Sequence, residues 1–185
     1  MKLFVNALAK FFCGFLLVGL LIFLPAGTLA FSKGWLLMGL LFGPMFLAGL
    51  VMLRKSPDFL AKRLDVKEKR SAQQGVIKLS GLMFIAGFVV AGLDFRFGWS
   101  RLPGWVNVLG AVLFLSAYAL FAEVLRENTW LSRTIEVQEG QTVVSTGLYG
   151  IVRHPMYSAT LLLFLSMPLV LGSIPAFLVF LSYPA

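Results

Sequence analysis

The chain has 185 residues, of which 59% are hydrophobic and only 13% are charged, and its mean hydropathy is +0.89. A soluble domain of this length cannot bury so much apolar surface, because much of its exterior must face water. The net charge of +8 would suit a nucleic-acid partner if the basic residues formed one soluble face, but they lie between apolar runs. The composition therefore predicts an integral membrane protein and no nucleic-acid partner.

Four apolar segments are long enough to cross about 30 Å of hydrocarbon as helices. They are residues 11–31, 35–53, 76–93 and 105–125. A fifth segment, 155–171, is just long enough, and 175–185 would form only part of a sixth helix. We therefore expect an all-α integral membrane fold, a single domain over residues 1–185, with five transmembrane helices and a truncated sixth.

The distribution of lysine and arginine predicts the orientation of the helices. Residues 54–75 carry seven basic residues. If this loop, Lys78 beside it, the N-terminus and residues 126–153 are cytoplasmic, thirteen basic residues lie inside and three outside. We expect a cytoplasmic N-terminus. The basic loop itself has two interpretations, an anchor on anionic lipid headgroups or a guide for an anionic substrate.

The longest polar stretch precedes the fifth helix. Residues 134–138 alternate polar and apolar side chains, Glu139-Gly140 suits a turn, and residues 141–145 again favour a strand. This pattern predicts a small β-hairpin at the cytoplasmic surface, inside a segment 126–157 that would hold the functional site.

The end of that segment, Arg153-His154-Pro155, has the pattern of an anion site. Proline suits the first position of a helix, and free backbone N–H groups at a helix start next to arginine attract anions. Arginine can also hold a carboxylate bidentately. In the alternative interpretation Arg153 reaches lipid phosphates, His154 caps the helix, and Tyr157 belongs to the aromatic belt.

Two acidic residues lie one helical turn apart near the end of the fourth helix. Glu123 and Glu127 could face the same pocket, or they could contact Arg126 and water. A lone histidine without cysteines or carboxylates beside it does not indicate a metal site. The single cysteine, Cys13, allows no disulfide within the chain.

Three motifs around the start of the fifth helix carry a family resemblance: Glu139-Gly140-Gln141, Gly147-Leu148-Tyr149 and Val152-Arg153-His154-Pro155-Met156-Tyr157. With them the sequence resembles the isoprenylcysteine carboxyl methyltransferase family, whose bacterial members are small membrane enzymes related to phospholipid N-methyltransferases. The resemblance is specific over residues 127–175 and only architectural over residues 1–126. It implies a location in a bacterial inner membrane.

The resemblance also implies a cofactor and an acceptor. The methyl donor would be S-adenosyl-L-methionine, bound at the cytoplasmic face, and the acceptor a lipid-like or prenylated small molecule that arrives from the bilayer. Carried over position by position, the catalytic positions fall on Arg153 and His154. The cofactor contacts fall on Gln138, Gln141, Thr142, Val143, Val144, Tyr149, His154, Pro155, Met156 and Tyr157.

The chain departs from the family at two places. Ala159 occupies a position that is often glycine, and the family's last helix and acidic tail would follow residue 185. We therefore expect a fragment; the alternative is that residues 155–185 form one long broken span. The alternative to an enzyme is a non-catalytic membrane protein, such as a degenerate family member, a scaffold or a transport subunit. Nothing in the sequence selects a prenyl chain over a phospholipid, or fixes the oligomeric state.

Overall fold

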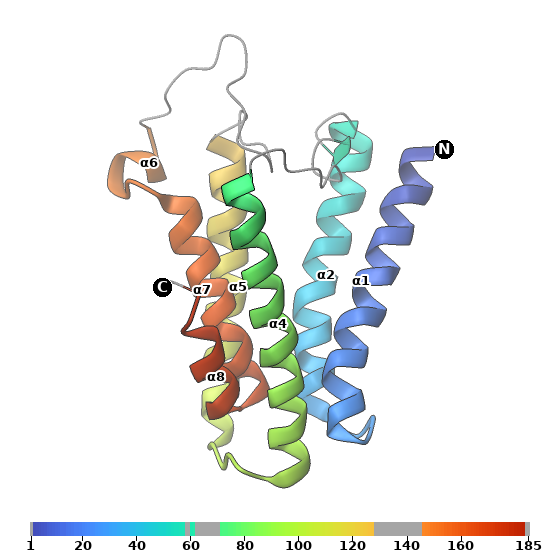
Figure 1. The fold of residues 1–185 in the computed structure, drawn as a ribbon. Helices are drawn as coiled ribbons and strands as arrows, with labels where there is room; N and C mark the ends of the chain where they lie inside the picture. The colour runs from blue at the N-terminus through green and yellow to red at the C-terminus, as the bar shows by residue number, and fades with distance from the viewer. Residues whose placement is uncertain (1, 58–59, 62–70, 128–145, 184–185) are drawn as a thin grey trace.

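A computed structural model describes residues 2–57, 60–61, 71–127 and 146–183, without the side chains of residues 2 and 71–74 (Figure 1). Within these ranges all regular structure is helical and no strand occurs. The helices are α1 (Lys2–Ala26), α2 (Ser32–Lys55), α4 (Ser71–Phe97), α5 (Gly104–Glu127), α6 (Leu148–Ile151), α7 (Pro155–Leu171) and α8 (Ile174–Phe180). The β-hairpin predicted over residues 134–145 lies outside the described residues.

Four of these helices, α1, α2, α4 and α5, are long and apolar enough to cross a membrane. They confirm the predicted all-α membrane fold. The structure does not support the predicted count of five spans and part of a sixth. Helix α7 has 17 residues and rises about 26 Å, and α8 has only seven and rises about 10 Å. Both fall short of the roughly 30 Å of a hydrocarbon core.

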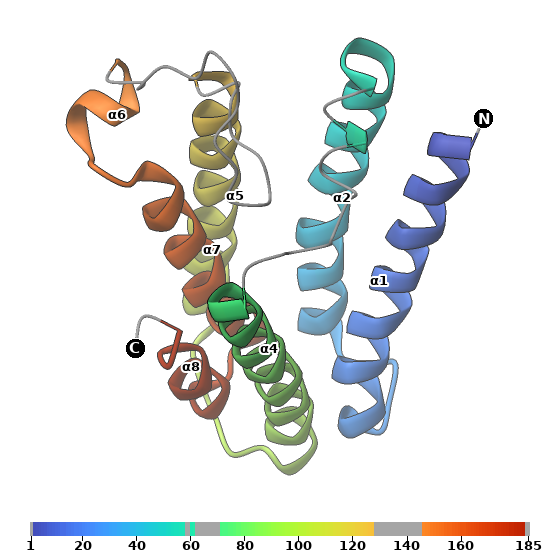
Figure 2. The ribbon, with the colours of Figure 1, turned by 45° about the horizontal axis from the view of Figure 1, so that its top comes forward.

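The helices form a bundle with two distinct ends. Figures 1 and 2 place the α1–α2 hairpin on one side and α5, α6 and α7 on the other, with α4 between them. The N-terminus, the end of α2, the start of α4, the end of α5 and α6 lie at one end, which we call the α6 end. The opposite end, which we call the turn end, holds the α1–α2 and α4–α5 connections.

Phenylalanine rings contributed by most of these helices fill the core. Phe31, Phe42, Phe88, Phe114 and Phe180 belong to one buried cluster. The ring of Phe180 on α8 occupies the space that a side chain at position 87 of α4 would need. Burial of these rings fixes how α8 packs on α4.

The first helix ends earlier than the sequence predicted. We expected a helix over residues 11–31 and a link at Ser32-Lys33-Gly34, but α1 ends at Ala26 and α2 starts at Ser32. The reason is Gly27, which has φ of 70° and donates its N–H to the carbonyl of Phe23 at 3.1 Å. This is the left-handed conformation with which many helices end, and the apolar residues around it hid the signal.

The prediction for the third apolar segment was wrong in a different way. The segment predicted over residues 76–93 becomes α4, Ser71–Phe97, and therefore includes Asp94, which is only 3% exposed. Its carboxylate accepts hydrogen bonds from the backbone N–H of Ser100 at 2.7 Å and from the Ser100 hydroxyl at 2.6 Å. The same hydroxyl accepts from the N–H of Ile174 at 3.0 Å. This chain of hydrogen bonds attaches the first residue of α8 to the end of α4.

Helices α5 and α7 pack closely against each other. A side-chain carbon at Gly110 would lie 2.7 Å from the backbone nitrogen of Val170, so only glycine allows this approach. Next to it, the Asn107 amide donates to the carbonyls of Leu169 and Val170, both at 3.0 Å. The last carbonyls of a helix lack intrahelical partners, and the apolar interior offers no water. Asn107 supplies that partner.

Tyr118 forms a hydrogen bond to α2 next to the proline of that helix. Pro44 has no N–H for the carbonyl of Leu40, so the backbone ladder is interrupted there. The Tyr118 hydroxyl of α5 donates to the next carbonyl, that of Leu41, at 2.8 Å. This side chain links the hairpin to the other side of the bundle.

We predict that Asn107→Leu lowers the free energy of unfolding by about 1–2 kcal/mol, because the Val170 carbonyl loses its donor inside the apolar bundle and the Leu169 carbonyl keeps only the N–H of Gly172. Unfolding of the purified protein in mixed micelles, followed by circular dichroism, measures the loss. Val108→Leu is the control, since Val108 is exposed on the same helix. Equal stability of Asn107→Leu and wild type would contradict this role.

Candidate functional site

The motif residues lie at a corner between α6 and α7. The corner begins at Gly147, which has φ of 54° and ψ of −127°, a conformation that favours glycine. A side chain at this position would also collide with the carboxylate of Glu127. Both the backbone angle and the contact explain why a glycine stands directly before α6.

Glu127 at the end of α5 holds this corner in place. Its carboxylate oxygens accept from the N–H of Leu148 at 2.9 and 3.2 Å. The sequence indicated a shared pocket, or contact with Arg126 and water, for this residue; it did not predict the hydrogen bond to Leu148. Glu123 instead pairs with Arg126, with the closest nitrogen and oxygen 2.5 Å apart. The two carboxylates therefore have separate partners, although they lie one turn apart.

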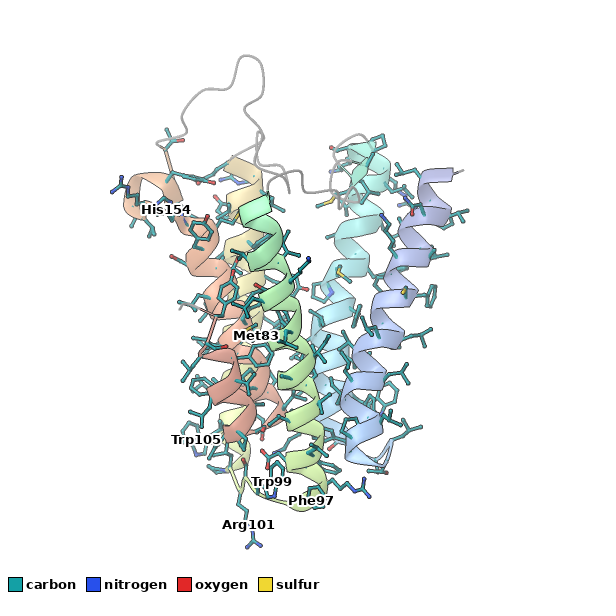
Figure 3. The ribbon with its side chains drawn as sticks, in the orientation of Figure 1. Met83, Phe97, Trp99, Arg101, Trp105 and His154 are labelled. Atoms are coloured by element: carbon teal, nitrogen blue, oxygen red, sulfur yellow. The ribbon has the colours of Figure 1, made fainter. Side chains whose placement is uncertain are left out.

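The start of α7 presents the predicted anion-binding residues. Pro155 is buried at the first helical position, as the sequence predicted, while Arg153 and His154 are exposed. His154 is the N-cap residue of α7, and its side chain makes no capping hydrogen bond. Its ring lies 5.6 Å from the ring of Tyr157, at an interplanar angle of 56°. Figure 3 shows His154 at the α6 end, far from Trp99, Arg101 and Trp105.

The structure brings part of the predicted cofactor set together. Arg153, His154, Pro155, Met156 and Tyr157 are consecutive at the corner, and Tyr149 is partly buried in α6. The other predicted contacts lie outside the described residues. These are Gln138, Gln141, Thr142, Val143 and Val144.

A groove opens beside this corner between α4, α7 and α8. Its volume is about 700 Å³, and most of its lining is apolar, including Leu79, Met83 and Leu161. Polar atoms come from a few hydroxyl-bearing side chains, Ser80, Tyr157, Ser182 and Tyr183. Tyr157 therefore contacts His154 on one side and lines the groove on the other.

The arrangement joins two kinds of chemistry. Arg153 offers a fixed positive charge and the first turn of α7 offers backbone N–H groups, so the corner can bind an anion. The groove can accept an apolar chain from the bilayer. Among the described residues no group of three His, Cys, Asp or Glu side chains could hold a metal ion.

A family model described as phospholipid methyltransferase matches residues 105–184. The match supports a membrane methyltransferase. It covers α5 to α8, and with them the corner and the α7 and α8 walls of the groove. The narrower resemblance to isoprenylcysteine carboxyl methyltransferases is not confirmed by it. No curated protein and no solved structure matches the chain.

Sequence reasoning missed three features of this region. It did not predict the hydrogen bond from the Leu148 N–H to the Glu127 carboxylate, because the two residues lie 21 positions apart. It also left out Ser80 and Tyr183, which the packing of α4 and the end of α8 bring to the same groove as Tyr157. No local pattern marks these residues, since only the tertiary arrangement brings them together.

We predict that Glu127→Ala speeds amide exchange at Leu148 about fivefold, because loss of a capping acceptor costs about 1 kcal/mol. Hydrogen–deuterium exchange of a peptide covering α6 and the start of α7 measures it. Glu123→Ala removes the same charge from the same helix and should leave this peptide unchanged. Equal exchange in both variants would refute the contact.

Proposed function

We propose that the protein transfers a methyl group from S-adenosyl-L-methionine to a lipid-like acceptor at the cytoplasmic membrane face. The observation that carries the proposal is the position of Tyr157, which adjoins the exposed Arg153-His154 corner and also lines the apolar groove. The proposed cofactor site and the apolar groove would thus share one side chain. The match of residues 105–184 to the phospholipid methyltransferase model supports the same reaction class.

The residues at the corner fit this cofactor. The Arg153 guanidinium would hold the cofactor carboxylate, because arginine binds a carboxylate with two parallel hydrogen bonds. The rings of His154 and Tyr157 offer aromatic faces for the adenine or the sulfonium, where a cation–π contact contributes about 0.5–2 kcal/mol. When bound, the cofactor supplies a methyl group already activated by its sulfonium.

The protein's own contribution would be alignment. Glu127 fixes the corner through Leu148, and the buried Pro155 fixes the start of α7. Holding a donor and an acceptor in reacting geometry can contribute about 7–11 kcal/mol to lowering the barrier. The low-polarity groove next to the corner would exclude water from the reacting groups.

The groove supports an amphiphilic acceptor. Its apolar lining suits an acyl or prenyl chain, and Tyr157 and Tyr183 would lie near the polar end of such a molecule. We propose a nucleophile at that end, either the carboxylate of an isoprenylcysteine-type acceptor or the amine of a phospholipid headgroup. Transfer to a carboxylate would give a methyl ester and S-adenosylhomocysteine, and transfer to a neutral amine would give the same leaving group and in addition release a proton.

Arg153→Gln should weaken binding of S-adenosylhomocysteine about 10- to 100-fold, because a hydrogen bond to a charged group contributes about 1.5–3 kcal/mol. Isothermal titration of detergent-purified protein measures this. Arg126→Gln is the matched control, since Arg126 is exposed at the same end but pairs with Glu123. Wild type that binds no S-adenosylhomocysteine would favour the non-catalytic alternative.

The two acceptor classes are separated by incubating the protein with radiolabelled S-adenosylmethionine and either a farnesylated cysteine derivative or phosphatidylethanolamine. Label released as methanol by base indicates a methyl ester, whereas label stable to base indicates a methylated amine. Tyr157→Ala should reduce transfer to the active acceptor. If the protein binds the cofactor but labels neither acceptor, both proposed acceptor classes are wrong.

The proposed orientation predicts which end of the bundle faces the cytoplasm. Arg126→Cys at the α6 end and Arg101→Cys at the turn end, each in a Cys13→Ser background, give one exposed thiol apiece. A membrane-impermeant maleimide added to spheroplasts should label Arg101→Cys, and should label Arg126→Cys only after permeabilisation. The reverse pattern would place the corner on the wrong face for a cytoplasmic cofactor.

A further inference from the structure

A second cavity lies between α1 and α2 near the α6 end. It has a volume of about 210 Å³, and its walls are formed by α1 residues from Phe4 to Phe11 and α2 residues from Met45 to Leu53. Leu60, which follows α2, is buried against it. We call it the hairpin cleft.

The hairpin cleft is apolar except for one charged side chain. Lys10 of α1 contributes to its wall, and every other lining residue is apolar. Arg54 and Lys55, both exposed, follow directly on Leu53 at the end of α2. Residues 1–57 contain no acidic residue at all. An apolar cavity next to three positive charges is complementary to an anionic lipid, because a neutral molecule would need no such charge.

The proposed methyltransferase site does not use this cleft. The lining belongs to α1, α2 and Leu60, outside the matched residues 105–184. Figure 2 shows the α1–α2 hairpin on the side of the bundle opposite α5, α6 and α7. A ligand here would therefore be distinct from both cofactor and acceptor.

We propose that the hairpin cleft binds one anionic phospholipid of the cytoplasmic leaflet. One acyl chain lies in the cleft against Phe11 and Phe46, and the phosphate lies near Lys10, Arg54 and Lys55. Lysine in an apolar helix extends its ammonium towards the headgroup level, which brings Lys10 to the phosphate. The ligand holds together the ends of two helices.

The chain offers a matched pair of positions for testing this site. Gly49 lines the hairpin cleft, and Gly39 on the same helix lines a different hollow. A side-chain carbon at either position meets no atom within 4 Å. Gly49→Leu therefore fills the cleft with little strain on the fold, while Gly39→Leu adds the same side chain elsewhere.

The experiment is native mass spectrometry of the full chain, released from detergent with equal amounts of palmitoyl-oleoyl phosphatidylglycerol and phosphatidylcholine. Wild type should retain the anionic lipid preferentially, at one molecule per chain. Gly49→Leu should lose that retention and Gly39→Leu should keep it. Lys10→Gln should weaken it about fivefold, the factor equivalent to about 1 kcal/mol for one basic residue near the surface. Lys78→Gln removes an exposed charge at the α6 end of α4 and should leave the retention of the anionic lipid unchanged.

Equal retention of the two lipids by wild type would overturn the proposal, as would retention by Gly49→Leu or equal loss in Gly39→Leu. Circular dichroism verifies that each variant keeps its helix content. If Gly49→Leu fails to fold, Gly49→Ala and Gly49→Val give a graded filling of the same cavity. Titration of S-adenosylhomocysteine into Gly49→Leu separates the two proposals, because binding there should match wild type.

Discussion

The close crossing of α5 and α7 is the contact on which the rest of the structure depends. At Gly110 the two backbones touch, and beside it the Asn107 amide pairs with two carbonyls at the end of α7. In an apolar interior, unpaired carbonyls would favour separation of the helices or entry of water. Because Asn107 satisfies them, α7 can end inside the bundle, and the chain can reverse into α8.

That reversal creates the groove. Helix α7 ends at Leu171, and the hydrogen bond from the Ile174 N–H to the Ser100 hydroxyl holds the start of α8 at the end of α4. Further along α8, the ring of Phe180 packs against Gly87 of α4. The contacts at the turn end thus determine how the walls of the groove are placed. At its other side, the groove is lined by Tyr157 at the start of α7. The corner and the groove are parts of one packing arrangement, joined through the length of α7.

The sequence was sufficient for the features that composition and local pattern encode. Apolar runs located the long helices, and Pro155 marked the start of α7 at the correct residue. The sequence failed where the decisive partner was distant. Asp94 remains inside α4 because Ser100 satisfies its carboxylate, and the Glu127 carboxylate accepts from the N–H of Leu148 at the start of α6, 21 residues along the chain. Gly27 was missed for another reason, since hydropathy does not distinguish a helix end inside an apolar run.

The unequal lengths of α5 and α7 determine how deep the corner lies. From the level of Asn107, α5 continues for 20 residues to Glu127 and rises about 30 Å, whereas the 15 steps from Val170 back to Pro155 rise only about 23 Å. The start of α7 is therefore recessed by about one helical turn below the end of α5. For the proposed methyl transfer, this recess would let an acceptor keep its chain among the lipids while its polar end reaches Arg153 and His154.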